Sequence, residues 1–153
     1  MRTHLTTLLL TVAGLFVGNA SAQTGPAASA GTVKVVQGQA RVVNATGERP
    51  LSPGDHVAMA DRVITGADSA TSLVLRDGTT LVVGPKSQLE LKDFAFNSTT
   101  HEGTVRVSLL QGALRMITGL IAKLHPANVN VETDTVTTGV RGTDFIVEIE
   151  DVR

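Results

Sequence analysis

The sequence contains no cysteine, no tryptophan and no tyrosine, and only four of its 153 residues are phenylalanine. Without cysteine the chain has no thiol nucleophile, no thiolate metal ligand and no disulfide. Its stability must therefore come from a hydrophobic core and from backbone hydrogen bonds. The scarcity of aromatic rings argues against a site that stacks sugars or nucleotide bases on aromatic faces.

Charged residues are also few, and neither sign predominates. The chain has 13 Lys and Arg against 14 Asp and Glu, a formal net charge of −1 at pH 7, and the charges are scattered along its length. Binding to a nucleic-acid backbone or to an anionic membrane surface needs clustered Lys and Arg. We therefore expect neither as a partner.

Long apolar runs are confined to the N-terminus. Arg2 precedes the apolar stretch Leu5–Val17, and Ala20-Ser21-Ala22 places small residues where a signal peptidase reads them. A run of about 13 residues is too short to cross a bilayer, although a buried N-terminal helix or a retained anchor would have the same composition. We expect residues 1–22 to be a cleaved signal peptide and 23–30 a flexible leader. The mature protein would then be periplasmic or secreted, with no integral membrane anchor.

The remaining chain, residues 31–150, has the pattern of short strands. Apolar and polar residues alternate in runs such as Thr104–Leu110, and turn signals recur every eight to twelve residues. This spacing predicts one all-β domain of about a dozen short, antiparallel-type strands in a sandwich, barrel or solenoid. Lys92–Gly103 is more polar and is predicted to be a surface excursion. Gly119–Ala127 is ambiguous, but Gly119 and Pro126 leave little room for a helix.

Two hairpins are predicted from their turn residues. Asp77-Gly78 joins two β-rich runs, and Asp-Gly is typical of a type I′ turn, in which both central residues have positive φ. Gln111-Gly112 separates two further alternating runs and predicts a second hairpin. In the last strand, alternation predicts that Phe145 points inward and Asp144 outward.

No constellation of residues indicates catalysis or metal binding. His56, His101 and His125 lie far apart in the sequence, and Asp55-His56, the nearest approach to a ligand pair, follows Pro-Gly in a turn where Asp usually serves the turn itself. The serines lie in strand or turn contexts, and none stands in a Gly-x-Ser-x-Gly nucleophile elbow. We therefore expect no cofactor, no bound metal and no enzymatic activity.

Arg141 is the one charged residue that its setting singles out, because it lies between Gly139 and Gly142 directly before the last strand. The structural interpretation is that its guanidinium caps strand-end carbonyls or pairs with a carboxylate such as Asp144 or Asp77. The alternative is that Arg141 contacts a ligand. The candidate turn and closing-strand residues are Asp77, Gly78, Gly112, Gly139, Arg141, Gly142, Thr143 and Phe145.

The order of these motifs resembles the FecR-type (iron-dicitrate sensor) domain. That family has a Leu-x-Asp-Gly-Ser/Thr hairpin, a Ser-x-Leu-x-Leu strand, a Leu-x-x-Gly hairpin and a final Gly-Thr-x-Phe-x-Val strand. All four occur here in family order, within residues 31–149. The segments that carry the resemblance are Leu75–Val83, Ser87–Leu91, Leu109–Leu114, Val131–Thr133 and Val140–Val147.

The resemblance implies a rolled or solenoid-like sheet on the extracytoplasmic side of a bacterium. In the regulators that name the family, this region is the periplasmic part of a transmembrane anti-sigma factor and receives a signal from an outer-membrane receptor. Here a signal peptide is expected in place of the cytosolic segment. We therefore expect a non-catalytic domain that binds an envelope protein, in signalling or sensing. The alternatives are a module for cell-wall glycan or another small ligand and, third, an enzyme that uses Asp55-His56 or Arg141.

Overall fold

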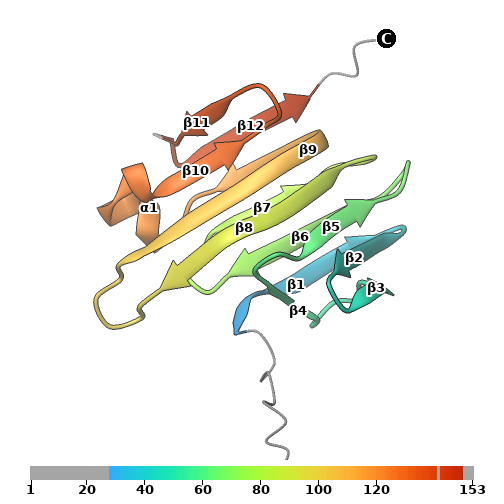
Figure 1. Ribbon diagram of the computed structural model, residues 1–153, viewed down its shortest axis with the longest axis horizontal. Helices are drawn as coiled ribbons and strands as arrows, with labels where there is room; N and C mark the ends of the chain where they lie inside the picture. Colours follow the sequence, from blue (N-terminus) through green and yellow to red (C-terminus); the bar gives the residue numbers. More distant parts are fainter. Residues whose placement is uncertain (1–27, 141, 150–153) are drawn as a thin grey trace, which may run out of the picture.

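The computed structural model describes residues 28–140 and 142–149 and shows a single rolled sheet of twelve strands (Figure 1). This confirms the predicted fold class. The predicted signal peptide and most of the leader lie outside the described residues. The strands are β1 (Ser29–Gln37), β2 (Ala40–Asn44), β3 (Gly47–Pro50), β4 (His56–Ala58), β5 (Arg62–Thr65), β6 (Ala70–Leu75), β7 (Thr80–Val83), β8 (Gln88–Phe96), β9 (Gly103–Ile117), β10 (Val129–Glu132), β11 (Thr137–Gly139) and β12 (Asp144–Ile149).

Three boundaries differ from the sequence predictions. β1 begins at Ser29, inside the predicted leader, because the small Ala30 side chain is buried in the core at 1% exposure. β8 continues to Phe96, into the predicted surface excursion, because Phe94 is buried at 5% exposure and holds the strand against the core. A short helix, α1 (Leu120–Leu124), forms where none was expected, and it packs the fully buried Ile121.

Most of the sheet consists of strand segments joined end to end through a bend. β1 leads into β2, β5 into β6 and β7 into β8, and β9 runs unbroken across the same bend. Each bent segment pairs antiparallel with the next on both sides of the bend, since β6 pairs with β7 while β5 pairs with β8. β9 likewise pairs with β8 before the bend and with β7 after it. The bend therefore divides the sheet into two halves that pack face to face.

We call the two halves half-sheet A and half-sheet B. Half-sheet A is formed by β4, β1, β6, β7, the C-terminal part of β9 and β12. Half-sheet B is formed by β3, β2, β5, β8, the N-terminal part of β9, β10 and β11. Their inward side chains make one apolar core between them. Leu81 and Met116 come from half-sheet A and Leu89 and Leu109 from half-sheet B, all at 2% exposure or less. The core therefore follows the alternation of the strands.

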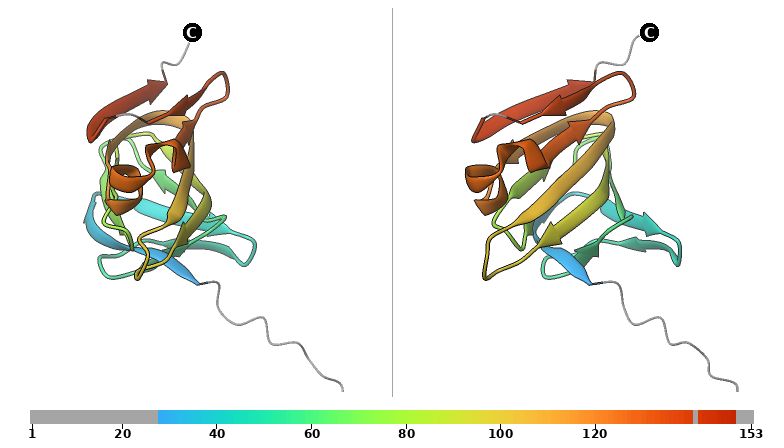
Figure 2. Two further views of the ribbon diagram at one scale, coloured as in Figure 1. Left: turned by 90° about the vertical axis from the view of Figure 1, so that its left-hand side faces the viewer. Right: turned by 60° about the vertical axis from the view of Figure 1, so that its left-hand side comes forward.

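The rolled sheet of the described strands does not close on itself, and two of its sides are open (Figure 2). The outermost strands are β3 and β4 at one open end, and β11 and β12 at the other. β10 pairs with β9 in parallel, the one parallel pairing among the described strands, and α1 and the 3₁₀ turn η1 (Pro126–Asn128) connect the two. No helix in the described part of the chain is long and apolar enough to cross a membrane.

Candidate functional site

The predicted Asp77-Gly78 hairpin forms between β6 and β7, but its turn is not type I′. Gly78 has φ +85°, whereas Asp77 is absent from the described residues with positive φ. The Gly78 N–H donates to the Leu75 carbonyl at 3.0 Å, and the Leu75 N–H donates to the Thr79 carbonyl at 2.8 Å. These bonds define a three-residue loop that ends in a left-handed glycine.

Asp77 is a buried structural group in this turn, at 1% exposure. Its carboxylate accepts hydrogen bonds from the Thr79 N–H at 3.0 Å and from the Thr79 hydroxyl at 2.7 Å. The Asp77 carbonyl accepts from the Leu120 N–H at 2.9 Å, and the Thr79 hydroxyl oxygen accepts from the Gly119 N–H at 3.1 Å. The turn therefore anchors the start of α1, and the carboxylate has no free side for a ligand.

Gly112 does not form the predicted second hairpin. It lies inside β9, which continues from Gly103 to Ile117, and its φ of +80° bends the strand at the junction of the two half-sheets. A Cβ at this position would overlap the Ser87 side chain. Alternating segments on either side of a glycine look the same in sequence whether the chain reverses or bends, so the turn prediction was wrong.

A line of hydrogen-bonded small residues crosses the strands at this bend, and we call it the corner. The Ser69 hydroxyl oxygen accepts from the Gln39 N–H at 2.8 Å, and the Ser87 hydroxyl oxygen accepts from the Ala113 N–H at 2.9 Å. Both serines are buried. Sequence reasoning missed this feature, although Gly66-x-x-Ser69 and Gly84-x-x-Ser87 repeat one pattern. The corner consists of Gly38, Gln39, Thr65, Gly66, Ser69, Gly84, Ser87 and Gly112.

The final segment is placed in part. Arg141 lies outside the described residues, so the two interpretations of its role remain predictions. Gly139 ends β11, and Gly142 and Thr143 precede β12, where their carbonyls face the Thr118 hydroxyl at 3.3 and 3.5 Å. Phe145 packs, half-buried, against the core and Asp144 is exposed, as the alternation predicts.

Among the described residues, Asp144 forms an ion pair with Arg115 on β9. The sequence analysis did not consider this partner. The guanidinium donates through Nε at 2.9 Å and Nη2 at 2.6 Å to the two carboxylate oxygens. These hydrogen bonds hold the pKa of Asp144 below its ordinary value and raise that of Arg115. Both side chains are exposed, so the pair adds little stability but fixes the orientation of two surface side chains.

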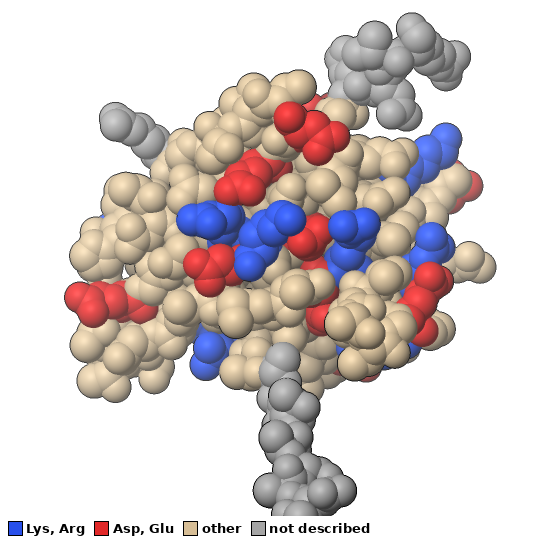
Figure 3. All heavy atoms as spheres, in the orientation of Figure 1, with Lys and Arg blue, Asp and Glu red and all other residues tan. Residues whose placement is uncertain are grey.

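The outer face of half-sheet B carries a network of paired charges. Glu90 accepts from Arg62 and from Lys92, each at 2.9 Å, and Arg106 lies 3.4 Å from Glu132. The hydrogen bond from Lys92 is the main cause of the lowered pKa of Glu90. Basic and acidic side chains are interspersed across the face drawn in Figure 3, which shows no patch of one sign there.

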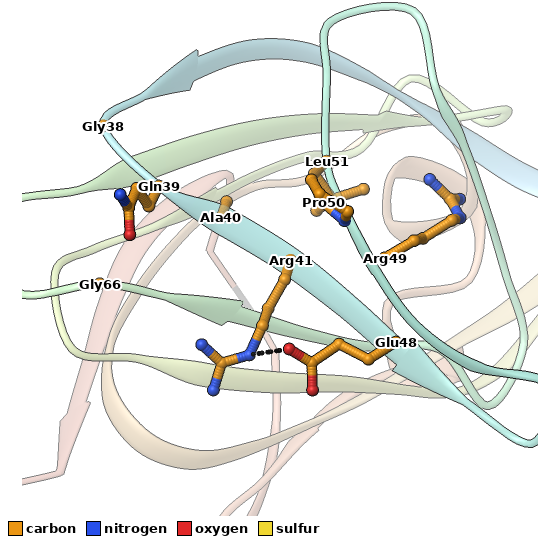
Figure 4. Close-up of a pocket in the computed structure, with 9 residues that line it drawn as sticks. All are labelled: Gly38, Gln39, Ala40, Arg41, Glu48, Arg49, Pro50, Leu51 and Gly66. Atoms are coloured by element: carbon orange, nitrogen blue, oxygen red, sulfur yellow. Dashed lines mark ion pairs between the residues drawn. The ribbon is translucent and has the colours of Figure 1, made fainter.

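A groove of about 460 Å³ lies where β2 and β3 meet the corner (Figure 4). Gly38 and Gly66 form one end of it, and the ion pair between Arg41 Nε and Glu48, at 3.0 Å, crosses the strands on its lining. Leu51 adds a buried apolar base. The groove therefore offers planar, solvent-exposed hydrogen-bonding groups beside an apolar surface.

The Asp55-His56 pair is used within the fold. The Asp55 carboxylate accepts from the Ser52 N–H and from Arg49, each at 2.9 Å, while His56 Nδ1 lies 3.3 Å from the Ser29 hydroxyl. Asp55 therefore holds its own turn, as its position after Pro-Gly suggested. No group of three or more His, Asp or Glu side chains that could hold a metal ion occurs in residues 28–140 and 142–149.

Comparison with known proteins agrees with the order of the motifs. The sequence profile of the FecR protein family matches residues 61–153, which is more than half of the chain. A solved structure described as "Cell surface anchoring domain" is 30% identical, covers 42% of this chain and 87% of its own, and superposes with a TM-score of 0.41. The comparison with curated proteins gives no match. FecR domains are in general extracytoplasmic sensor or signalling domains and are not known as enzymes. The chain belongs to the FecR protein family.

Proposed function

We propose that this protein is an exported, non-catalytic FecR domain that works in the bacterial envelope by binding another protein, in signalling or sensing. The observation that carries the proposal is the open roll: β3, β4, β11 and β12 each pair on one side only among the described strands. An open strand edge presents N–H and C=O groups that an incoming strand can satisfy. The family membership supports the same class of function.

The hydrogen bonds of three carboxylates, those of Asp55, Asp61 and Asp77, support a non-catalytic role. The carboxylates of Asp55 and Asp77 accept hydrogen bonds within their own turns. Buried Asp61 accepts from the Asn44 amide and from the Ala58 N–H, each at 2.9 Å. These groups stabilise loops, and their oxygens are occupied by backbone and side-chain donors of the same fold.

The test is crosslinking in the producing cell with a photoreactive residue placed on the protein, followed by identification of the captured molecules. A defined envelope protein that is captured reproducibly, and that binds the purified domain directly, supports the proposal. Retention of the purified domain on peptidoglycan, with no protein captured, would contradict it. The control variant carries the photoreactive residue at Ser72 on β6, a strand that is paired on both sides and lies away from the open edges.

The groove beside the corner favours a second candidate function, the binding of a cell-wall glycan. Planar side chains such as Arg41 and Glu48, placed next to the apolar Leu51, can hydrogen-bond to vicinal hydroxyl groups. The near absence of aromatic residues weighs against it. Sedimentation with purified peptidoglycan tests this function: Arg41→Ala should abolish retention, whereas the control Arg106→Ala, on a different ion pair, should not.

A further inference from the structure

We propose that β12 is the docking edge, and that it accepts an extended segment of a partner protein in which two basic residues flank apolar ones. The added strand would extend half-sheet A beyond β12. This inference rests on the proposed function and specifies the contact by which it operates. Four properties of β12 support it: its length, the direction of its backbone groups, its exposed apolar side chains and its charges.

β12 is the longest of the open edges. It has six residues and pairs regularly with β9 from Asp144 to Ile149, with no bulge. β4 and β11 have three residues each, and β3 has four and ends in Pro50, which cannot donate a hydrogen bond. Edges that are short or contain proline are protected against strand addition. β12 has neither protection.

The backbone of β12 presents alternate residues to the open side. The Thr118 N–H donates to the Thr143 carbonyl at 2.9 Å, which places the N–H and C=O groups of odd-numbered residues toward β9. The groups of Asp144, Ile146 and Glu148 therefore point away from β9. These three residues would form the hydrogen bonds to an added strand.

The side chains of β12 are only partly covered. Ile146 is 68% exposed, the highest value among the large apolar residues that the structure describes. On the other face Phe145, Val147 and Ile149 are half-buried against the core at the open end of the roll. An added strand with apolar residues opposite them would cover both faces of β12.

The charges of β12 favour a basic partner over a second copy of the chain. Both charged residues on its outward face, Asp144 and Glu148, are acidic. Asp144 already pairs with Arg115 on β9, so Glu148 carries the unbalanced negative charge among the described residues of this edge. Antiparallel self-pairing centred on Ile146 would place Asp144 opposite Glu148 of the other copy, and like charges directly opposite each other are destabilising. Self-pairing centred on Val147 would place Ile146 opposite Glu148. A segment with Lys or Arg opposite the two carboxylates has neither conflict.

The probe is a synthetic peptide with the core Lys-Val-Val-Val-Lys, added to the full isotope-labelled protein. Amide hydrogen exchange followed by NMR is the readout. We expect the amides of Asp144, Ile146 and Glu148 to become protected, while those of Phe145 and Val147, which already bond to β9, change little. A peptide of the same sequence that is N-methylated at alternate residues keeps the side chains but cannot pair along its edge, so it should not protect them.

Two variants separate edge pairing from general apolar contact. Ile146→Pro removes the outward N–H, and we expect peptide binding to be lost while the melting temperature stays near that of the wild type, because this N–H does not bond to β9. Ile146→Thr keeps the N–H and the β-branched shape, so binding should persist. Glu148→Lys should weaken binding up to about fivefold and strengthen binding of the matched Glu-Val-Val-Val-Glu peptide by a similar factor.

Three outcomes would overturn the inference: no exchange protection on β12 with any peptide, equal binding by the N-methylated peptide, or self-association of the protein through β12. The proposed function has a separate readout. If crosslinking captures a protein partner but the crosslinked residues lie away from β12, the docking edge is wrong and the function stands. If no protein partner is captured, the function itself is wrong.

Discussion

At the scale of single residues, glycines at the corner and at the hairpin turn determine where the chain can bend. Gly112 and Gly78 both have φ near +80°, but only Gly112 is also crowded, because a Cβ there would overlap Ser87. Gly78 has no neighbour within 4 Å of that position. The two glycines therefore separate the energetic cost of the backbone conformation from that of close packing.

Substituting these two glycines should destabilise the protein unequally. For Gly78→Ala we expect a loss of about 1 kcal/mol in the free energy of unfolding, from backbone strain alone. For Gly112→Ala we expect about 2–4 kcal/mol, because the methyl group must also displace buried Ser87. Denaturant unfolding of both variants measures the difference. Equal losses would contradict the close packing at the corner.

The ion pair between Arg115 and Asp144 should appear in the pH dependence. Because the pKa of Asp144 is lowered in the folded protein, its contribution to stability is present above the unfolded value of about 3.9. That contribution is lost as the pH falls through the lower folded pKa. We expect the pKa of Asp144, measured by NMR titration, to rise toward the ordinary value of an Asp side chain in Arg115→Gln, because the hydrogen bonds that lower it are lost. Lys34→Gln, which removes a charge on β1, should leave the titration unchanged.

At the scale of elements, β9 connects the molecule. Its N-terminal part pairs with β8 and β10, and its C-terminal part pairs with β7 and β12. Apolar side chains on both sides of Gly112, such as Leu109, Leu114 and Met116, are fully buried. The two half-sheets therefore share one strand, and we expect them to unfold together.

Truncation of a buried β9 side chain should affect the whole fold. We expect Leu114→Ala to lower the free energy of unfolding by about 2–5 kcal/mol, since it leaves a cavity in the core. Ile117→Ala on the same strand should cost less than about 1 kcal/mol, because Ile117 is 38% exposed. Thermal unfolding followed in both half-sheets should give one transition in each variant. Two separate transitions would show that the half-sheets are independent.

The sequence predicts the strands better than it predicts their connections. Alternation locates β6, β7, β9 and β12 and the inward side of Phe145, because burial of one face imposes a period of two residues. It does not distinguish a bend from a hairpin at Gly112, because glycine serves both. The partner of Asp144 also could not be predicted, since Arg115 becomes its neighbour only through the register of β12 on β9.

At the scale of the whole molecule, the family match and the folded unit have different limits. The match begins at Asp61, whereas β1–β4 precede it and pair with the matched part through β5 and β6. Val33, Val42 and Val57, all at 2% exposure or less, come from this preceding part. The strands before residue 61 are therefore part of the same core.

A chain that contains only residues 61–153 should fail to fold cooperatively. It would lose those buried side chains and would expose the edges of β5 and β6. Circular dichroism during heating is the measurement, and we expect no sharp transition, in contrast to a chain that begins at Ala28. Cooperative unfolding of the shorter chain would show that β1–β4 are an accessory to the core.

The open ends of the roll also affect how such a protein can vary in length. In a closed barrel, the number of strands, their tilt and their stagger are linked, so one strand cannot be added alone. Here, among the described strands, β3 does not pair with β4 at one open end, and β11 does not pair with β12 at the other. A further bent strand could be added beside β12, or removed, while each remaining strand kept its neighbours and its register. The architecture therefore allows the number of strands to differ from one relative to another without a change in the fold.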